Sequence, residues 1–210
     1  AVPEGVEYIG YMGLPDVKTL SLPSTLRRVN ESSSSMSTFA YGIENISVAD
    51  GNRYYGVEDG CLVMYDGMKV IASVLGATSL PDGYEIVGAY AFSHKAIDAL
   101  TIPSSYYEIM ARAFEAGEFT SVVIPDSVGI LSSSAFNRCD AISELSIGAR
   151  ISAADARGLF SEMRTESLST VSVSVNNVQM HSESNVIYDS SDGSIVFAPE
   201  KLAGDVVIPE

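Results

Sequence analysis

The sequence offers few imidazole and thiol groups for acid–base or nucleophilic catalysis. There are two histidines, His94 and His181, and two cysteines, Cys61 and Cys139. A serine hydrolase needs a histidine beside its serine and a carboxylate that orients the histidine, and neither histidine stands in a recognisable motif of that kind. The sequence contains no phosphate-binding loop, zinc-ligand spacing or dinucleotide fingerprint. We therefore predict no catalytic residue, no metal site and no cofactor.

Acidic and hydroxyl residues give two weaker indications of a functional site. The segment 189–194, Asp-Ser-Ser-Asp-Gly-Ser, is rich in oxygen atoms but lacks the alternating carboxylates and the distal Glu of an EF-hand, so a turn explains it better. The 27 Asp and Glu side chains leave another interpretation open, because two carboxylates brought together by folding can cleave a glycosidic bond. A carbohydrate-active enzyme with a β-solenoid fold is therefore the alternative to a protein without catalysis.

The composition narrows the class of partner. The chain has 210 residues, 46% of them hydrophobic, and 12 Lys and Arg against 27 Asp and Glu, which gives a formal charge of -15. Such a charge disfavours nucleic acid and anionic lipid, which attract clustered positive charge. The longest apolar run lies near residues 70–75, far short of the roughly 18 residues that span a bilayer. We expect neither nucleic-acid binding nor membrane insertion.

A repeat organises the whole chain. The pair Ala-Phe occurs at residues 91–92, 113–114 and 135–136, each 22 residues after the last, and an Ile-Pro or Leu-Pro pair precedes each one. Periods of this size indicate stacked coils. About eight coils are expected over residues 1–210, with strands that end at Leu22, Val48, Leu80, Ile102, Ile124, Ile147, Val173 and Ile208.

Each coil has a common plan. The expected strand is an apolar-x-apolar triplet such as Leu145-Ser146-Ile147, whose outer residues point into the coil while the middle one points outward. A Pro then ends strand pairing in several coils. Six residues after the Pro comes an apolar residue, for example Val87 or Ile109, which we assign to the core. The Ala-Phe stretch that follows suits a short helical segment on the opposite side.

Two coils carry insertions. Asp66-Gly67 and Asp192-Gly193 each lie between runs of β-forming residues, and Asp-Gly in that setting is a strong hairpin signal. We predict inserted β-hairpins near 52–73 and 185–199.

The order of residue types in the repeat resembles that of the BspA-type leucine-rich repeats of bacterial surface proteins. The likeness is closest over residues 80–147, where residues 135–147 match the full-length unit, including a Cys at Cys139, while Lys95 and Gly117 stand at the equivalent position of shorter coils. Residues 148–173 depart from it, since Gly158-Leu159-Phe160 replaces Ala-Phe. The resemblance implies an α/β repeat solenoid: a right-handed coil with a parallel β-sheet on one face, short helical or irregular segments on the other, and the two hairpins.

The resemblance also implies a role and a location. Proteins of this family are exported, sit on bacterial envelopes and act in adhesion. For this chain it implies a non-catalytic binding scaffold at the cell surface or outside the cell, whose partner is a host or bacterial surface protein or glycan. No signal segment opens the sequence, so we expect the targeting signal to lie outside this chain.

The outward strand face is the predicted binding surface, because repeat proteins commonly bind through such a face. An equally good explanation is that small polar residues only keep a solvated sheet from aggregating. Alternative contacts are Tyr54-Tyr55 and Tyr106-Tyr107, with one Tyr of each pair buried. The candidate residues of the face are Lys18, Ser21, Glu44, Ser47, Asp98, Thr101, Thr120, Val123, Glu144, Ser146, Thr170 and Ser172.

Two further expectations follow from the stacking. Cys61 and Cys139 lie several coils apart, beyond the roughly 7 Å between Cα atoms that a disulfide allows, so we predict two buried free thiols. The chain begins and ends on apolar strand residues with no polar capping segment, and terminal coils of a solenoid need such a cover. We therefore expect it to be a segment of a longer array that can self-associate end to end.

Overall fold

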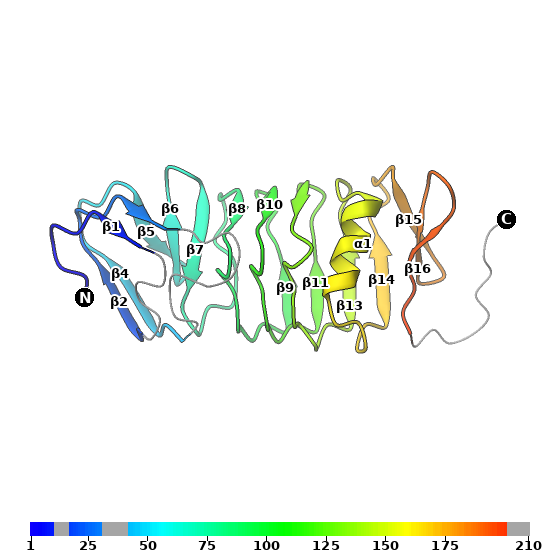
Figure 1. The fold of residues 1–210 in the computed structure, drawn as a ribbon, viewed down its shortest axis with the longest axis horizontal. Coiled ribbons are helices and arrows are strands. Elements are labelled where there is room, and N and C mark those ends of the chain that lie inside the picture. The colour runs from blue at the N-terminus through cyan, green and yellow to red at the C-terminus, as the bar shows by residue number, and fades with distance from the viewer. Residues whose placement is uncertain (11–16, 31–41, 201–210) are drawn as a thin grey trace.

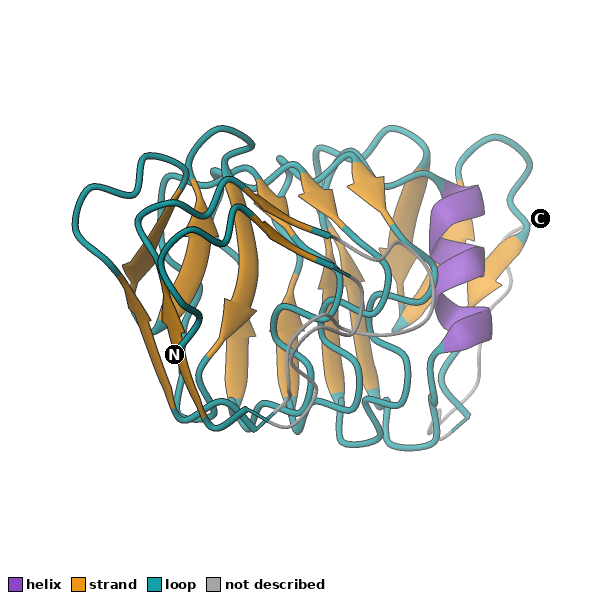
Figure 2. Cartoon of the chain, turned by 60° about the vertical axis from the view of Figure 1, so that its left-hand side comes forward, coloured by secondary structure: helices purple, strands orange, loops and turns teal. Residues whose placement is uncertain are grey.

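The computed structural model describes residues 1–10, 17–30 and 42–200. Figure 1 shows these residues as one elongated stack of coils that follow each other in chain order along the long axis. Strands of successive coils stand side by side in Figure 2. The predicted solenoid with parallel sheets is confirmed.

The apolar-x-apolar triplets form parallel strands in register. In the four-stranded sheet the residues Leu100, Val122, Leu145 and Val171 pair across neighbouring strands and are all buried. Their alternation with exposed residues follows from the two-residue period of a strand. The strands of this kind are β2 (Thr19–Leu22) and β4 (Asn45–Val48), which pair with each other, and β9 (Ala99–Thr101), β11 (Ser121–Val123), β13 (Glu144–Ile147) and β14 (Thr170–Val173).

One predicted strand is wrong. No strand ends at Leu80, although the side chain of Leu80 is buried. The local sequence is Thr78-Ser79-Leu80, so the first apolar residue of the triplet is missing and only one side chain can anchor a strand there. The predicted strand that ends at Ile208 lies outside the described residues.

The core position six residues after the Pro belongs to a second set of short parallel strands, which the sequence did not predict as strands. Ile9, Val29, Val87, Ile109 and Leu131 are buried on these strands as expected. The second set lies along the upper side of the stack in Figure 1, where β8 and β10 are labelled. It consists of β1 (Tyr8–Ile9), β3 (Arg28–Val29), β8 (Ile86–Val87), β10 (Glu108–Ile109) and β12 (Ile130–Leu131).

The Ala-Phe pairs lie in turns rather than helices. Residues 89–94, 111–116 and 133–138 are turns, and the Ala and Phe of each pair are fully buried or nearly so. Within the described ranges the single helix is α1 (Ala153–Glu162), in the coil that departs from the Ala-Phe pattern. That coil is longer, and Ser152 caps the helix by accepting a 3.0 Å hydrogen bond from the backbone N–H of Asp155.

The phenylalanines stack from coil to coil. The ring of Phe114 lies 4.9 Å from that of Phe136 at an interplanar angle of 7°, and 5.9 Å from that of Phe92. Phe119 meets Phe114 edge-on at 5.8 Å. These contacts explain why the Ala-Phe pair recurs: Ala lets the turns approach, and Phe fills the space between coils.

Each insertion is a three-stranded antiparallel meander. The first comprises β5 (Tyr55–Glu58), β6 (Cys61–Met64) and β7 (Lys69–Ser73); the second comprises β15 (Met180–Glu183), β16 (Val186–Asp189) and β17 (Ile195–Phe197). The second insertion thus starts before residue 185. β7 also pairs in parallel with β8, which joins the first meander to the second set of strands.

The two meanders have the same type of first turn, and each is held by the side chain of one Asn. Asp59-Gly60 and Ser184-Asn185 have positive φ at both turn residues, as a tight type I′ hairpin requires. Ser184-Asn185 lacks the Asp-Gly signal, which is why the sequence missed that turn. Asn177 donates to the carbonyls of Gly148 and Ile151 and accepts from the N–H groups of Gln179 and Met180.

Asn52 holds the first meander in the same way. Its side chain donates to the carbonyls of Pro23 and Leu26 and accepts from the N–H groups of Tyr54 and Tyr55. In both insertions one Asn therefore pins the new strand to the coil before it.

Both thiols are buried, as predicted, and each is free in the structure. Cys139 Sγ donates to the carbonyl of Phe114 in the preceding coil, at 3.0 Å. Burial raises the pKa of each thiol to about 12. At the equivalent coil position Lys95 is also buried, and burial lowers the pKa of its ammonium to about 8.

In the residues that the structure describes, no helix combines the length and the apolar character needed to cross a membrane.

Candidate binding face

The candidate residues fall on two separate sheets. Lys18 and Glu44 flank the two-stranded sheet β2–β4, which carries Ser21 and Ser47, and the other eight lie on or beside the four-stranded sheet β9–β11–β13–β14. In the described part of the chain no strand of this set lies between β4 and β9. The predicted face is therefore divided where the triplet at Leu80 fails.

On the two-stranded sheet the candidate side chains bind one another. Ser47 donates to the hydroxyl of Ser21 at 3.0 Å. Lys18 Nζ lies 2.9 Å from Glu44 Oε1, and this hydrogen bond raises the pKa of Lys18. Both partners of the ion pair are exposed, so its contribution to stability is small. This sheet offers a partner few uncommitted groups.

On the four-stranded sheet the outward residues form two parallel rows. Register places Thr101, Val123, Ser146 and Ser172 side by side in the first row. The second row, two residues earlier in each strand, contains Ala99, Ser121, Glu144 and Thr170. Ser121 was not a candidate, although it pairs with Glu144 in the same row as the candidates Glu144 and Thr170. The strand period places one outward residue on each side of the inward residue.

The two rows line a shallow depression. Its volume is about 140 Å³, and its lining includes Val123, Glu144, Ser146, Thr170 and Ser172. The hydroxyls of Ser146, Thr170 and Ser172 make no hydrogen bond within the described residues, so each retains a donor and acceptor sites for a ligand. Val123 is 40% exposed and adds an apolar contact. The four-stranded sheet thus brings five candidate residues together into one surface.

Asp98 and Thr120 directly precede strands β9 and β11, and their polar groups are engaged, unlike the hydroxyls of the two rows. The hydroxyl of Thr120 donates to both the carbonyl and the carboxylate of Asp98, each at 2.7 Å. Ser143 and Ser169 continue this ladder, each donating from its hydroxyl to the carbonyl one coil back. These groups link successive coils, which leaves the two rows of the sheet as the free surface.

The tyrosine pairs split as predicted. Tyr55 and Tyr106 are buried, whereas Tyr54 and Tyr107 are 36% and 37% exposed. Tyr54 lies outside the four-stranded sheet, in the segment that leads into β5.

The two histidines lie in different surroundings. His94 is exposed in a turn rather than on a helix. His181 stacks on Tyr188, and its Nδ1 lies 3.2 Å from the hydroxyl of Ser190. The carboxylate of Asp189 is engaged elsewhere, by Ser191 and Arg157.

The oxygen-rich segment 189–194 is a turn. Asp189 accepts hydrogen bonds from the backbone N–H and hydroxyl of Ser191, and these bonds lower the pKa of its carboxyl group. Asp192 likewise accepts from the N–H of Ser194. Among the described residues no group of three or more His, Cys, Asp and Glu side chains is placed to hold a metal ion.

Stacked coils with a polar face of parallel strands define a leucine-rich-repeat solenoid. The family model described as "BspA type Leucine rich repeat region" matches residues 73–190 in six copies, which is more than half of the chain. The chain therefore belongs to the BspA-type leucine-rich repeat family.

Solved structures show the same fold at low sequence identity. A leucine-rich repeat protein from Eubacterium ventriosum is 18% identical with a TM-score of 0.58, over 82% of this chain and 47% of that one. For the pneumococcal vaccine antigen PcpA the values are 16% and 0.57, over 86% and 51%. A leucine rich cell surface protein from Faecalibacterium prausnitzii gives 14% and 0.60, over 82% and 52%. The chain spans about half of each of these proteins, and no curated protein matches its sequence.

Proposed function

We propose that this chain is a non-catalytic binding scaffold exposed at a bacterial cell surface, and that it recognises a surface protein or glycan through the four-stranded sheet. The observation that carries the proposal is the pair of in-register rows whose hydroxyls have no partner within the described residues. Membership of the family supports a repeat scaffold. Two structural neighbours are a cell surface protein and a vaccine antigen, and this supports the location.

The physical character of the face favours a large and relatively flat partner. Its strands are fixed by parallel pairing and by the buried residues beneath them, so little conformational entropy is lost on binding. Small hydroxyl side chains allow close approach, and Val123 supplies an apolar contact at the centre. Glu144 is the carboxylate of the second row, which together with the charge of -15 disfavours a polyanionic partner.

A binding screen tests the proposal. The chain would be immobilised and exposed to host matrix proteins, mucins and a glycan array, and every hit would be measured again with Ser172→Arg. We expect a loss of about tenfold or more, because the long side chain covers the depression. The matched control is Ser104→Arg, which adds the same side chain at an exposed turn. Equal effects of the two substitutions would contradict binding through the sheet.

The same screen separates the proposal from the enzyme alternative. Incubation with the glycan panel should leave every glycan intact. Turnover that is lost in Glu144→Gln, or in another single carboxylate substitution, would establish a carbohydrate-active enzyme instead.

End-to-end self-association also stays a prediction. It was based on both ends of the chain, and the carboxyl-terminal segment 201–210 lies outside the described residues. Sedimentation over a range of concentrations tests it, and a strict monomer would contradict it.

A further inference from the structure

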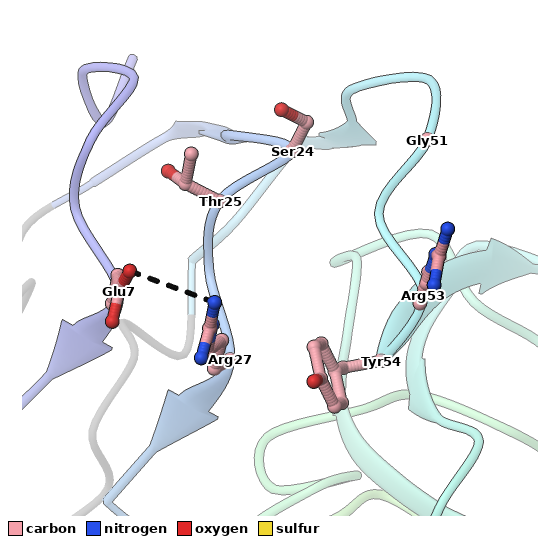
Figure 3. A pocket seen from close by; sticks show the side chains of 7 residues that line it. All are labelled: Glu7, Ser24, Thr25, Arg27, Gly51, Arg53 and Tyr54. Carbon is pink, nitrogen blue, oxygen red and sulfur yellow. Dashed lines mark ion pairs between the residues drawn. The ribbon is translucent and has the colours of Figure 1, made fainter.

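A second hollow lies near the amino-terminal end of the stack, away from the four-stranded sheet. It has a volume of about 310 Å³ and opens between the segments that lead into β1, β3 and β5. Figure 3 shows the side chains of Glu7 and Arg27 on one wall and those of Arg53 and Tyr54 on the other. Its size is at the lower end of the range for small-molecule sites, about 300 to 1,000 Å³.

The pocket carries more positive than negative charge, on a chain whose formal charge is -15. Among the described residues that line it are two arginines, Arg27 and Arg53, and one acidic residue, Glu7. The closest ion-pair distance between Arg27 and Glu7 is 3.8 Å, and both side chains are more than half exposed, so the pair is weak. Arg53 makes no ion pair or hydrogen bond within the described residues. Two guanidinium groups are thus available to an anion.

Glu4, a carboxylate close to this pocket, is engaged by the lining residue Ser24. It accepts hydrogen bonds from the backbone N–H and hydroxyl of Ser24, at 2.9 and 3.0 Å. The hydroxyl of Thr25 donates to the carbonyl of Val6. The Thr25 oxygen also accepts a hydrogen bond from the backbone N–H of Gly5, at 2.9 Å. Because the hydroxyl protons of Ser24 and Thr25 are already used, these two lining oxygens can act only through their remaining acceptor sites.

Tyr54 supplies the apolar part of the pocket. It is 36% exposed, and in Figure 3 its ring extends from the β5 side into the space facing Arg27. An exposed aromatic face stacks well against the C–H groups of a pyranose ring, since the electron-rich face attracts their positive edge.

We infer that this pocket binds a carboxylate-bearing sugar residue of a larger glycan. Arg53, on the wall opposite Arg27, holds the carboxylate, because a guanidinium group binds a carboxylate in a planar, two-point geometry. Tyr54 stacks on the sugar ring, and the oxygens of Ser24 and Thr25 accept hydrogen bonds from its hydroxyls. This site is separate from the four-stranded sheet and does not depend on the function proposed for that sheet.

The test uses defined saccharides with the intact chain. Binding of 3′-sialyllactose and of a uronic-acid tetrasaccharide would be measured by isothermal titration calorimetry, with lactose as the neutral control. We expect at least one acidic saccharide to bind and lactose not to bind. Preference for sialyllactose would indicate a sialylated glycan as the source, and preference for the uronic acid a polysaccharide.

Substitutions then locate the site. Arg53→Gln should weaken binding of the acidic saccharide about tenfold or more, and Tyr54→Ala should weaken it several-fold while Tyr54→Phe keeps it. Arg150→Gln removes the same charge from an exposed position elsewhere and should change the affinity less than about twofold. Ser172→Arg, on the four-stranded sheet, should leave it unchanged.

Three results would overturn the inference. The first is the absence of binding to both acidic saccharides. The second is equal weakening by Arg53→Gln and Arg150→Gln, which would indicate a general charge effect. The third is an affinity for a glutamate-rich peptide that equals or exceeds that for the saccharides, which would show that the pocket recognises acidic peptides.

Discussion

Phe114 is the residue on which the stacking of the central coils depends most. Its side chain is completely buried, and its ring contacts those of Phe92, Phe119 and Phe136 in three different coil segments. Replacing it with Ala empties a site enclosed on all sides, which costs about 3 to 5 kcal/mol for a buried Phe. The three aromatic pairs are lost as well, each worth about 0.5 to 1.5 kcal/mol beyond burial. We therefore expect Phe114→Ala to lie near the upper end, about 5 kcal/mol.

The measurement is equilibrium unfolding in urea, followed by far-ultraviolet circular dichroism because the chain has no Trp. Tyr107→Ala is the control, since Tyr107 is an aromatic side chain that is 37% exposed and should cost much less. Hydrogen exchange shows whether the loss is spread along the stack or confined to neighbouring coils. A loss below about 1 kcal/mol for Phe114→Ala would mean that the ring does not fill the space between coils, and the register would be refuted.

The remaining predictions concern the anchor of a meander and the buried polar groups. Asn177→Ala removes four hydrogen bonds and leaves buried backbone groups unpaired, so it should lower the free energy of unfolding by about 2 to 4 kcal/mol. The control Asn176→Ala, at the exposed neighbouring residue, should lower it by less than about 1 kcal/mol. Equal losses in the two variants would contradict the anchor role of Asn177. The ammonium of Lys95 loses its proton near pH 8 in the folded chain and near its ordinary pKa of 10.5 when unfolded. The unfolded chain therefore binds more protons between pH 8 and 10.5. The free energy of unfolding of the wild type should rise over this range by up to about 3 kcal/mol relative to that of Lys95→Met. A difference between the two proteins that stays constant with pH in urea titrations would refute this expectation. Cys61 and Cys139 should resist alkylation in the native chain and both react in denaturant, and an intramolecular bridge in non-reducing mass analysis would contradict their placement.

The sequence predicted the repeat and the core well, because both depend on local patterns. Triplets such as Leu145-Ser146-Ile147 place two apolar side chains on one side of a strand whatever the neighbouring coil contains. The strands around Val87 and Ile109 were identified only as core positions, since two-residue strands are too short for alternation to show. The Ala-Phe turns were mistaken for helices because Ala favours helix, whereas residues such as Arg112 and Ala116 adopt positive φ there.

On the binding face, residues that share the same place in the sequence repeat differ in their structural surroundings. The sequence identified the middle, outward residue of each apolar-x-apolar triplet, yet the ability of that residue to bind a ligand depends on the groups beside it. Ser21 and Ser47 satisfy each other, whereas Ser146 and Ser172, the same residue type in the same phase, have hydroxyls without a partner in the described chain. The sequence named Tyr54 as a possible contact but did not predict the pocket around it, because the lining residues come from three successive coils and Arg53 and Tyr54 belong to the insertion rather than to the repeat. In a solenoid the repeat therefore predicts the scaffold, and the departures from it, such as the insertion after Asn52, create the sites that differ from coil to coil.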